Sequence, residues 1–405
     1  MKKINKFVIG VLVILIGVCI YYFSYQNNKT LFIKDEEIQQ KSFLENKQAV
    51  LYLSTTADQD MDNRGISYSI FLDDEGKTSA YKMKGLELGS IAISEDNKEV
   101  LLESKDKIRI IGDMYQEFDM KNQYTGEKTG YLKNRDLYFS IYNTGVNTST
   151  GNYDSNVVFG NKKGFKMGNI PYYISTSGIN EDEVIILTKD IEKNQHDLRR
   201  VIIGGNEVKV ENVIQLENEK NAEYASLSSI ISDDKYYYFI LSEYVSETSE
   251  NVILFRVNKE TLKQEKITVS KYKNNNNLVS IIPFNIKNST YLYDNELYYI
   301  NGLGEVFTLN TKTNDIAIKF TIKNAPKDGV RHNEETFFQN GNLYVLRYNI
   351  NAKNKYYIEV YSLKSGEKLN EIKMEGLDKI LSSVKGKSIY SYDFKMLDLS
   401  GDFSE

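Results

Sequence analysis

Short runs of apolar and aromatic residues recur along almost the whole chain, and each lies beside a turn rich in Asp, Asn or Lys. Seven runs share this character and lie at 99–102, 136–139, 183–186, 236–241, 296–299, 342–345 and 388–390. Their spacing averages about 48 residues, which is the length of a four-stranded propeller blade. Short strands repeated at this spacing predict an all-β domain built from similar sheets.

A second pattern follows three of these runs and has the form of an outer hairpin. It occupies 254–257, 306–309 and 360–363, where alternating apolar residues lead into polar turns. Together the two patterns resemble the β-propeller superfamily, in particular its PQQ-like and WD40-like members, over residues 48 to about 400. The sequence has no Trp and no Gly-His pair, so true WD40 repeats are not indicated.

The number of blades follows from the count of strand cores. When the first run, at 49–53, is added, seven intervals separate the strand cores. We expect seven blades in which the N-terminal and C-terminal strands share one closing sheet, with eight blades as the alternative. Closure is favoured because an open fan of sheets leaves its first and last surfaces unpacked. A pair of β-sandwiches is the other all-β arrangement with strands of this kind.

Composition agrees with strands and excludes two classes of function. The chain has 31 Tyr and 18 Phe but only 3 Pro, and aromatic residues suit a pleated, half-buried surface. Its one cysteine, Cys19, lies in the N-terminal apolar run, so the rest of the chain has no thiol for a disulfide, a metal or nucleophilic catalysis. The net charge is −5 and no basic stripe is present, which excludes a nucleic-acid partner.

The N-terminal segment has the features of a membrane anchor. Lys2, Lys3 and Lys6 precede an uncharged apolar run at 7–23, whose 17 residues reach the lower limit for a spanning helix. The lysines are expected to stay in the cytoplasm, which places the following residues outside. No small-x-small cleavage site follows, so we expect the run to be retained. The predicted anchor includes Phe7, Leu12, Leu15, Cys19 and Phe23.

An alternative to the helical anchor is a lipoprotein, because residues 16–19 loosely resemble a lipobox in which Cys19 would be lipidated. Either form places a single-pass or tethered protein at the cell membrane, with its C-terminal domain extracytoplasmic and its N-terminal segment in contact with lipid. The chain is predicted to divide into a cytoplasmic tail, the anchor, a polar stalk with a helical segment, and the propeller, at 1–6, 7–23, 24–47 and 48–405.

One loop has the pattern of a calcium site. Asp58, Asp60 and Asp62 stand at alternate positions between two strand-like runs, and Ca²⁺ prefers several hard oxygen ligands. The loop resembles the calcium loops of integrin-type propellers, with Asn63 in place of the usual Gly. An EF-hand is excluded because Ser69 stands where the twelfth position requires Glu. A solvated acidic turn explains the same residues, so both interpretations stay open, and Ca²⁺ is the only cofactor indicated.

The sequence contains no recognisable catalytic signature. His196 and His332, the only histidines, stand among charged neighbours and are expected in exposed loops, and no Gly-x-Ser-x-Gly elbow accompanies them. Propeller glycosidases, however, need only two carboxylates from different blades. The chain is therefore predicted to be a non-enzymatic binding or scaffolding module for an envelope protein or a glycan. A glycan hydrolase or lyase is the alternative, which carboxylates converging with aromatic residues at the central funnel would favour.

Overall fold

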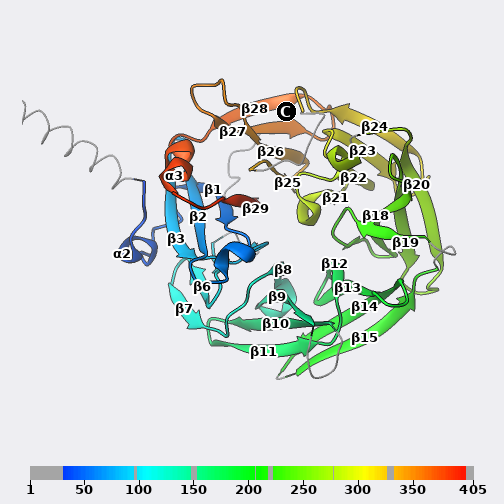
Figure 1. Cartoon of the computed structure of the whole chain (residues 1–405), viewed down its shortest axis with the longest axis horizontal. Helices are drawn as coiled ribbons and strands as arrows, with labels where there is room; N and C mark the ends of the chain where they lie inside the picture. The colour runs from blue at the N-terminus through cyan, green and yellow to red at the C-terminus, as the bar shows by residue number, and fades with distance from the viewer. Residues whose placement is uncertain are drawn as a thin grey trace, which may run out of the picture.

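The computed structural model describes residues 31–94, 98–146, 153–205, 207–217, 222–276, 278–325 and 333–397. The described residues form seven antiparallel sheets arranged as blades around one axis (Figure 1). Six blades have four strands, and the fifth blade has one additional short strand. The predicted all-β propeller with seven blades is therefore confirmed.

The blades are numbered along the chain, and each is given from its inner strand outward. Blade 1 consists of β29 (Tyr390–Met396), β1 (Lys47–Ser54), β2 (Ile66–Asp73) and β3 (Thr78–Lys84). Blade 2 consists of β4 (Ile91–Ile93), β5 (Val100–Glu103), β6 (Lys107–Ile111) and β7 (Gln116–Asp119). Blade 3 consists of β8 (Gly126–Leu132), β9 (Leu137–Val146), β10 (Tyr153–Asn161) and β11 (Gly164–Ile170).

Blade 4 consists of β12 (Ile174–Asn180), β13 (Glu183–Asp190), β14 (Gln195–Gly204) and β15 (Glu207–Gln215). Blade 5 consists of β16 (Tyr224–Ser226), β17 (Ile231–Ser232), β18 (Tyr236–Ser246), β19 (Ser249–Asn258) and β20 (Gln264–Tyr272). Blade 6 consists of β21 (Thr290–Tyr293), β22 (Glu296–Ile300), β23 (Glu305–Asn310) and β24 (Ile316–Thr321). Blade 7 consists of β25 (Glu335–Gln339), β26 (Asn342–Tyr348), β27 (Tyr356–Ser362) and β28 (Lys368–Lys373).

Six short helices complete the described elements. They are α2 (Asp35–Ile38), η1 (Asp58–Asp60), η2 (Lys133–Arg135), η3 (Leu278–Ile281), η4 (Ile286–Asn288) and α3 (Leu377–Ser383). No helix among the described residues is long and apolar enough to cross a membrane. The predicted span at 7–23 lies outside the described residues, so the structure does not bear on it.

The second and third strands of each blade form the core, because they pack between neighbouring blades on both faces. All four residues of β5 are buried, as are four of the five in β22, whereas the outer strands β24 and β28 are largely exposed or half-buried. The ring of Phe239 in β18, for example, stacks on Phe255 in β19 at a centroid distance of 5.4 Å. This burial explains why the sequence pattern marked second and third strands.

One of the predicted strand cores occupies a different position in its blade from the others. The run at 388–390 has the same composition as the second strands, but only Tyr390 of it lies in a strand, which is the inner strand β29. β29 pairs antiparallel with β1, so that Leu51 stands opposite Phe394 and the two ends of the chain close blade 1 together. The shared closing blade is thus confirmed, with the C-terminal strand at the centre of the ring.

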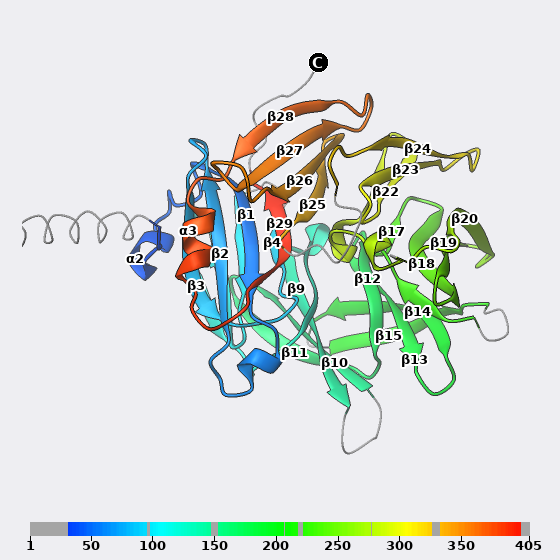
Figure 2. The ribbon, with the colours of Figure 1, turned by 45° about the horizontal axis from the view of Figure 1, so that its top comes forward.

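The residues before β1 lie along the outer side of blade 1 (Figure 2). The backbone N–H of Ala80 in β3 donates to the carbonyl of Leu31 at 2.8 Å, and the N–H of Ile33 donates back to the carbonyl of Ala80 at 2.9 Å. The helical segment expected in the polar stalk is a single turn, α2, with Lys34 at its N-cap. Its Ile38 is fully buried in the core between the first blades.

Candidate functional site

The inner strands form a closed ring around the propeller axis. Contacts run from blade to blade: β29 with β4, β4 with β8, β8 with β12, β12 with β17, and β17 with β21. Blade 7 joins the ring through β25, which contacts both β29 and the helix η4 that precedes β21. The inner strands of all seven blades therefore surround one axis (Figure 1). This centre is the part of the fold where ionisable groups gather.

Four carboxylates lie at the centre, and two of them are held by one loop of blade 6. Glu335, at the start of β25, accepts a hydrogen bond from Nδ2 of Asn285 at 2.6 Å. Asp393, in β29, accepts from Nδ2 of Asn288 at 2.9 Å and from the backbone N–H of Ile91 at 2.8 Å. Both carboxylates are only 2% exposed. Amide groups thus anchor the carboxylates of blades 7 and 1.

The other two carboxylates come from blades 2 and 3. Glu103, at the end of β5, accepts hydrogen bonds from the backbone N–H of Ser90 at 2.7 Å and from the hydroxyl of Tyr142 at 2.8 Å. Glu127, in β8, accepts one from the hydroxyl of Ser177 at 3.2 Å. Each of the four acids therefore has at least one hydrogen-bond donor.

Three lysines lie among these acids: Lys128 of β8, Lys287 of η4 and Lys395 of β29. The ammonium group of Lys287 donates to the carbonyl of Leu88 and, at 2.8 Å, to the hydroxyl of Ser90. It connects blade 6 with the loop that enters blade 2. These three lysines and four acids are called the central cluster.

The ammonium group of Lys395 is also well satisfied. It donates to Oδ1 of Asn288 at 2.9 Å, lies 3.4 Å from Oδ1 of Asp393, and stands 4.9 Å from the ring centroid of Phe337. Lys128 differs from both other lysines, because it makes no hydrogen bond or ion pair within the described part of the chain.

Burial perturbs the ionisation of the central cluster. Removal from water raises the pKa of the Glu335 carboxyl to about 8, and the nearby charge of Asp393 adds to that rise. Burial likewise lowers the pKa of Lys128 to about 8. The positive charges of Lys395 and Lys287 lower it further, while the carboxylates of Asp393 and Glu127 partly oppose this. Both groups titrate near physiological pH, which is frequent at functional sites.

A cavity of about 340 Å³ adjoins the central cluster and is lined mainly by the inner strands of blades 4 to 7. Lys128 and Lys287 are its charged residues, and no carboxylate lines it among the residues described. Tyr291, Phe337 and Phe338 supply an aromatic wall. Its volume falls at the small end of ligand sites, which range from about 300 to 1,000 Å³.

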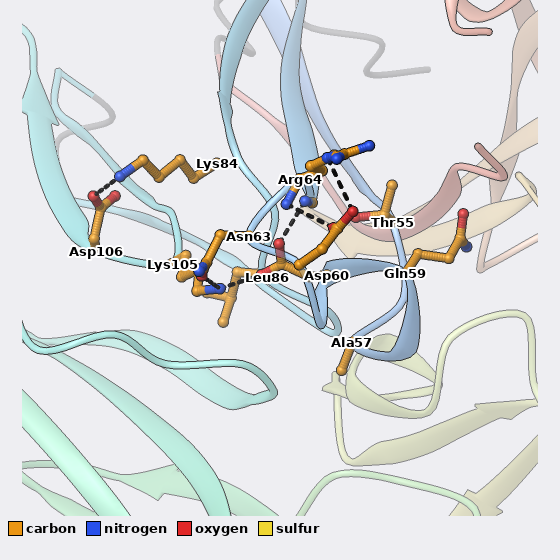
Figure 3. Close-up of polar contacts among 12 residues, drawn as sticks. Thr55, Ala57, Gln59, Asp60, Asn63, Arg64, Lys84, Leu86, Lys105 and Asp106 are labelled. Atoms are coloured by element: carbon orange, nitrogen blue, oxygen red, sulfur yellow. Dashed lines mark hydrogen bonds and ion pairs between the residues drawn. The ribbon is translucent and has the colours of Figure 1, made fainter. Parts of the chain in front are cut away.

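The predicted calcium loop holds an ion pair of the protein itself (Figure 3). Oδ2 of Asp60 lies 2.5 Å from the ammonium nitrogen of Lys105, which also donates to Oδ1 of Asn63 at 2.9 Å and stands 4.3 Å from the ring centroid of Tyr124. The other carboxylate oxygen accepts from the N–H of Gly65 at 2.5 Å. Lys105 belongs to blade 2, so the pair links blades 1 and 2.

The remaining acids of that loop do not join Asp60. Asp58 is exposed, and the carboxylate of Asp62 accepts from Arg64, whose Nε lies 3.0 Å from Oδ2. Within the described residues, no three His, Cys, Asp or Glu side chains are gathered as a metal site requires. Calcium binding at Asp58, Asp60 and Asp62 stays a prediction, and the chelation experiment below addresses it.

His196 does not lie in an exposed loop, and that expectation was wrong. It is part of β14 and is 2% exposed, with its ring 6.2 Å from that of Tyr224. Burial lowers the pKa of His196 to about 4, so the ring is neutral at physiological pH. Its neighbour Tyr224 belongs to the hydrophobic core of blades 4 and 5, so the ring packs against that core. His332, like the anchor residues, lies outside the described residues.

Sequence reasoning missed the central cluster. The signal was present as charged residues within short strands: Glu127 and Lys128 are adjacent in β8, and Asp393 and Lys395 flank a buried Phe394 in β29. Charges inside an otherwise apolar strand are costly unless they are paired or face a polar centre. Only the structure shows that β8 and β29 are inner strands, and therefore that their charged residues meet at the propeller axis.

The blade count and the ring of inner strands define the class of this protein, a seven-bladed β-propeller closed by its C-terminal strand. A family model described as "YycP, beta-propeller domain" matches residues 42–397, and the chain belongs to this family. It is 28% identical over 388 residues to the uncharacterized protein YycP of Bacillus subtilis (strain 168), covering 95% of this chain and 97% of that protein.

Several solved structures have a similar fold. A protein from Lactobacillus plantarum is 12% identical, with 87% of this chain and 100% of that one covered and a TM-score of 0.47. The β-propeller domain of the trilobed protease from Pyrococcus furiosus is 9% identical, with coverage of 81% and 95% and a TM-score of 0.46. BamB from Moraxella catarrhalis is 11% identical, with coverage of 69% and 74% and a TM-score of 0.40. At these identities and scores, the three structures say nothing of function.

Proposed function

We propose that this protein is a non-enzymatic binding module, tethered outside the cytoplasmic membrane, that holds its ligand in the central cavity. The observation that carries the proposal is the cavity itself, because it combines two ammonium groups with an aromatic wall at the point where the blades meet. A mainly apolar pocket with few convergent polar groups is the usual form of a ligand site. The N-terminal lysines and apolar run support the tether.

A hydrolase is the second candidate, and one observation favours it. Glu335 and Asp393, from different blades, lie close enough that the charge of Asp393 raises the pKa of Glu335, and a carboxyl with a pKa of about 8 carries a proton at neutral pH. A protonated acid beside a carboxylate is what glycoside hydrolysis uses. Against this, both side chains are 2% exposed, are hydrogen-bonded to amides, and do not line the cavity. Binding is therefore the better-supported function.

A thermal-shift screen of the full-length protein in lipid nanodiscs tests the binding role. Small carboxylates, phosphates, neutral sugars and cell-wall peptides are compared on the wild type and on Ser232→Trp, in which an indole fills the cavity. We expect at least one compound class to raise the melting temperature of the wild type and not that of the variant. If every compound acts equally on both proteins, the cavity is not the binding site.

Two further experiments address the tether and the enzymatic alternative. On intact cells, a protease that cannot enter the cytoplasm is expected to remove the propeller, whereas a chain that stays protected contradicts extracytoplasmic placement. For the hydrolase, Glu335→Gln and Asp393→Asn are compared with the wild type on cell-wall glycans. Release of reducing sugar by the wild type, lost in both variants, would establish the hydrolase in place of the binding module.

A further inference from the structure

Lys128 is the lysine of the central cluster that makes no hydrogen bond or ion pair among the described residues, although the charges of Asp393 and Glu127 act on it from a distance. The ammonium of Lys287 has two oxygen acceptors, and that of Lys395 has Asn288 and Asp393. Lys128 has none in the described part of the chain, although it lines the cavity and is more than half-buried. An ammonium held partly out of water without a hydrogen-bond acceptor is destabilising, so its position at the cavity favours an anionic ligand that pairs with it directly.

A second polar group facing the same cavity is also unsatisfied. Thr290, in β21, lines the cavity and is 8% exposed, and its hydroxyl oxygen has no hydrogen-bond partner within the described residues. Buried hydroxyls are normally hydrogen-bonded. A lysine from blade 3 and a hydroxyl from blade 6 thus both line the cavity without a hydrogen bond of their own among the described residues.

The rest of the cavity wall has the opposite chemistry. The rings of Tyr291 and Phe338, which both line the cavity, are stacked 5.6 Å apart with an interplanar angle of 6°. Ile179 and Ile231 add aliphatic surface from blades 4 and 5. A flat apolar body is suited to such a wall, because aromatic faces bury it at little cost in side-chain freedom.

We infer that the central cavity binds a small organic carboxylate, with its anionic group at Lys128 and Thr290 and an aromatic or aliphatic body against Tyr291 and Phe338. This inference rests on the proposed function, since it names the ligand class of the same cavity. The carboxylate supplies the ion-pair partner that Lys128 lacks, and it accepts a hydrogen bond from the Thr290 hydroxyl. No carboxylate among the described residues lines the cavity, so none competes with the ligand for direct contact with Lys128.

The inference is tested with 3-phenylpropionate and its neutral analogue 3-phenylpropionamide, titrated calorimetrically into the full-length protein in lipid nanodiscs, with empty nanodiscs as the blank. We expect the wild type to bind the acid at least about tenfold more tightly than the amide, since a hydrogen bond to a charged group contributes that much. Lys128→Met should bind the two equally, and Lys128→Arg should restore the preference. Lys82→Met, which alters an exposed lysine of β3, is the matched control and should behave as the wild type.

The outcomes separate this inference from the proposed function. Equal binding of acid and amide by the wild type, no binding of the acid, or an acid preference that survives Lys128→Met overturns the carboxylate assignment. In those cases, another compound class that stabilises the wild type and not Ser232→Trp would still support a binding cavity. If Ser232→Trp binds 3-phenylpropionate as the wild type does, both the assignment and the cavity are wrong.

Discussion

Lys105 and Lys128 both place an ammonium group inside the propeller, but their surroundings differ. Lys105 is 3% exposed and has a carboxylate, an amide oxygen and an aromatic face around it. Lys128 lines a cavity, has both lysines and carboxylates nearby, and lacks a hydrogen-bond partner in the part of the chain that the structure describes. The first arrangement is complete without a ligand, and the second is not. The pair of Asp60 and Lys105 therefore links blades 1 and 2, and the centre is where we expect a ligand to bind.

Removal of the partner of Lys105 should have the largest effect. Asp60→Ala leaves a buried ammonium without its carboxylate and should lower the free energy of unfolding by about 3–5 kcal/mol, measured by urea denaturation. The matched control is Asp62→Ala, which removes an exposed partner of Arg64 and should cost less than about 1 kcal/mol. Equal losses in the two variants would contradict a structural role for the buried pair.

Glu335 should make stability depend on pH between its ordinary pKa near 4.5 and its folded value of about 8. Over this window the folded state holds a proton that the unfolded state has lost, so the wild type loses stability as the pH rises. In Glu335→Gln this loss, on the order of 3 kcal/mol, should be absent. The free energy of unfolding of both proteins is measured by urea denaturation at pH 5 and at pH 8.5. An equal change between the two pH values in the wild type and in the variant would refute the prediction.

Lys128 should act with the opposite sign at higher pH. Its folded pKa of about 8 lies below its ordinary value of 10.5, so between these values the unfolded state holds the extra proton and the stability of the wild type rises with pH. The effect is expected on the order of 1 kcal/mol, because the cavity leaves the ammonium partly hydrated. Below pH 8, Lys128→Met should be as stable as the wild type or slightly more so. A variant destabilised as strongly as Asp60→Ala would mean that Lys128 has a structural partner.

Chelation should have the smallest effect. The ammonium of Lys105 already balances the carboxylate of Asp60, so a chelator is expected to leave the melting temperature of the full-length protein unchanged. A fall in melting temperature that added Ca²⁺ reverses would instead show that Asp58, Asp60 and Asp62 bind calcium. Asp58→Asn, which alters an exposed acid of the loop, would then reduce the effect.

The sequence predicted the fold further than it predicted the site. Second and third strands repeat as apolar runs because they are buried between blades, and the number and spacing of these runs indicated seven blades, with eight as the alternative. The inner strands gave no such signal, since they mix charges with small residues: β12 reads ISTSGIN, and β29 carries Asp393 and Lys395 around a buried Phe394. The run at 388–390 was consequently assigned to the wrong strand of the blade.

Neither the contacts of the predicted calcium loop nor the central cluster could be predicted from a local sequence pattern. Three acids close together in sequence indicated calcium, but the partner that engages Asp60 is Lys105, which is 45 residues away in another blade. The central cluster draws its members from β5, β8, η4, β25 and β29. No local pattern brings these residues together, because only closure of the ring does so.

The most direct test of the account is the titration of Lys128 itself, followed by NMR on lysine-labelled full-length protein in nanodiscs, with Lys128→Met used to assign the signal. The account predicts a pKa near 8 for the free protein and a higher pKa when 3-phenylpropionate is bound, because a carboxylate beside the ammonium stabilises its charged form. A Lys128 pKa that stays the same at saturating 3-phenylpropionate would contradict the claim that this lysine marks the ligand site.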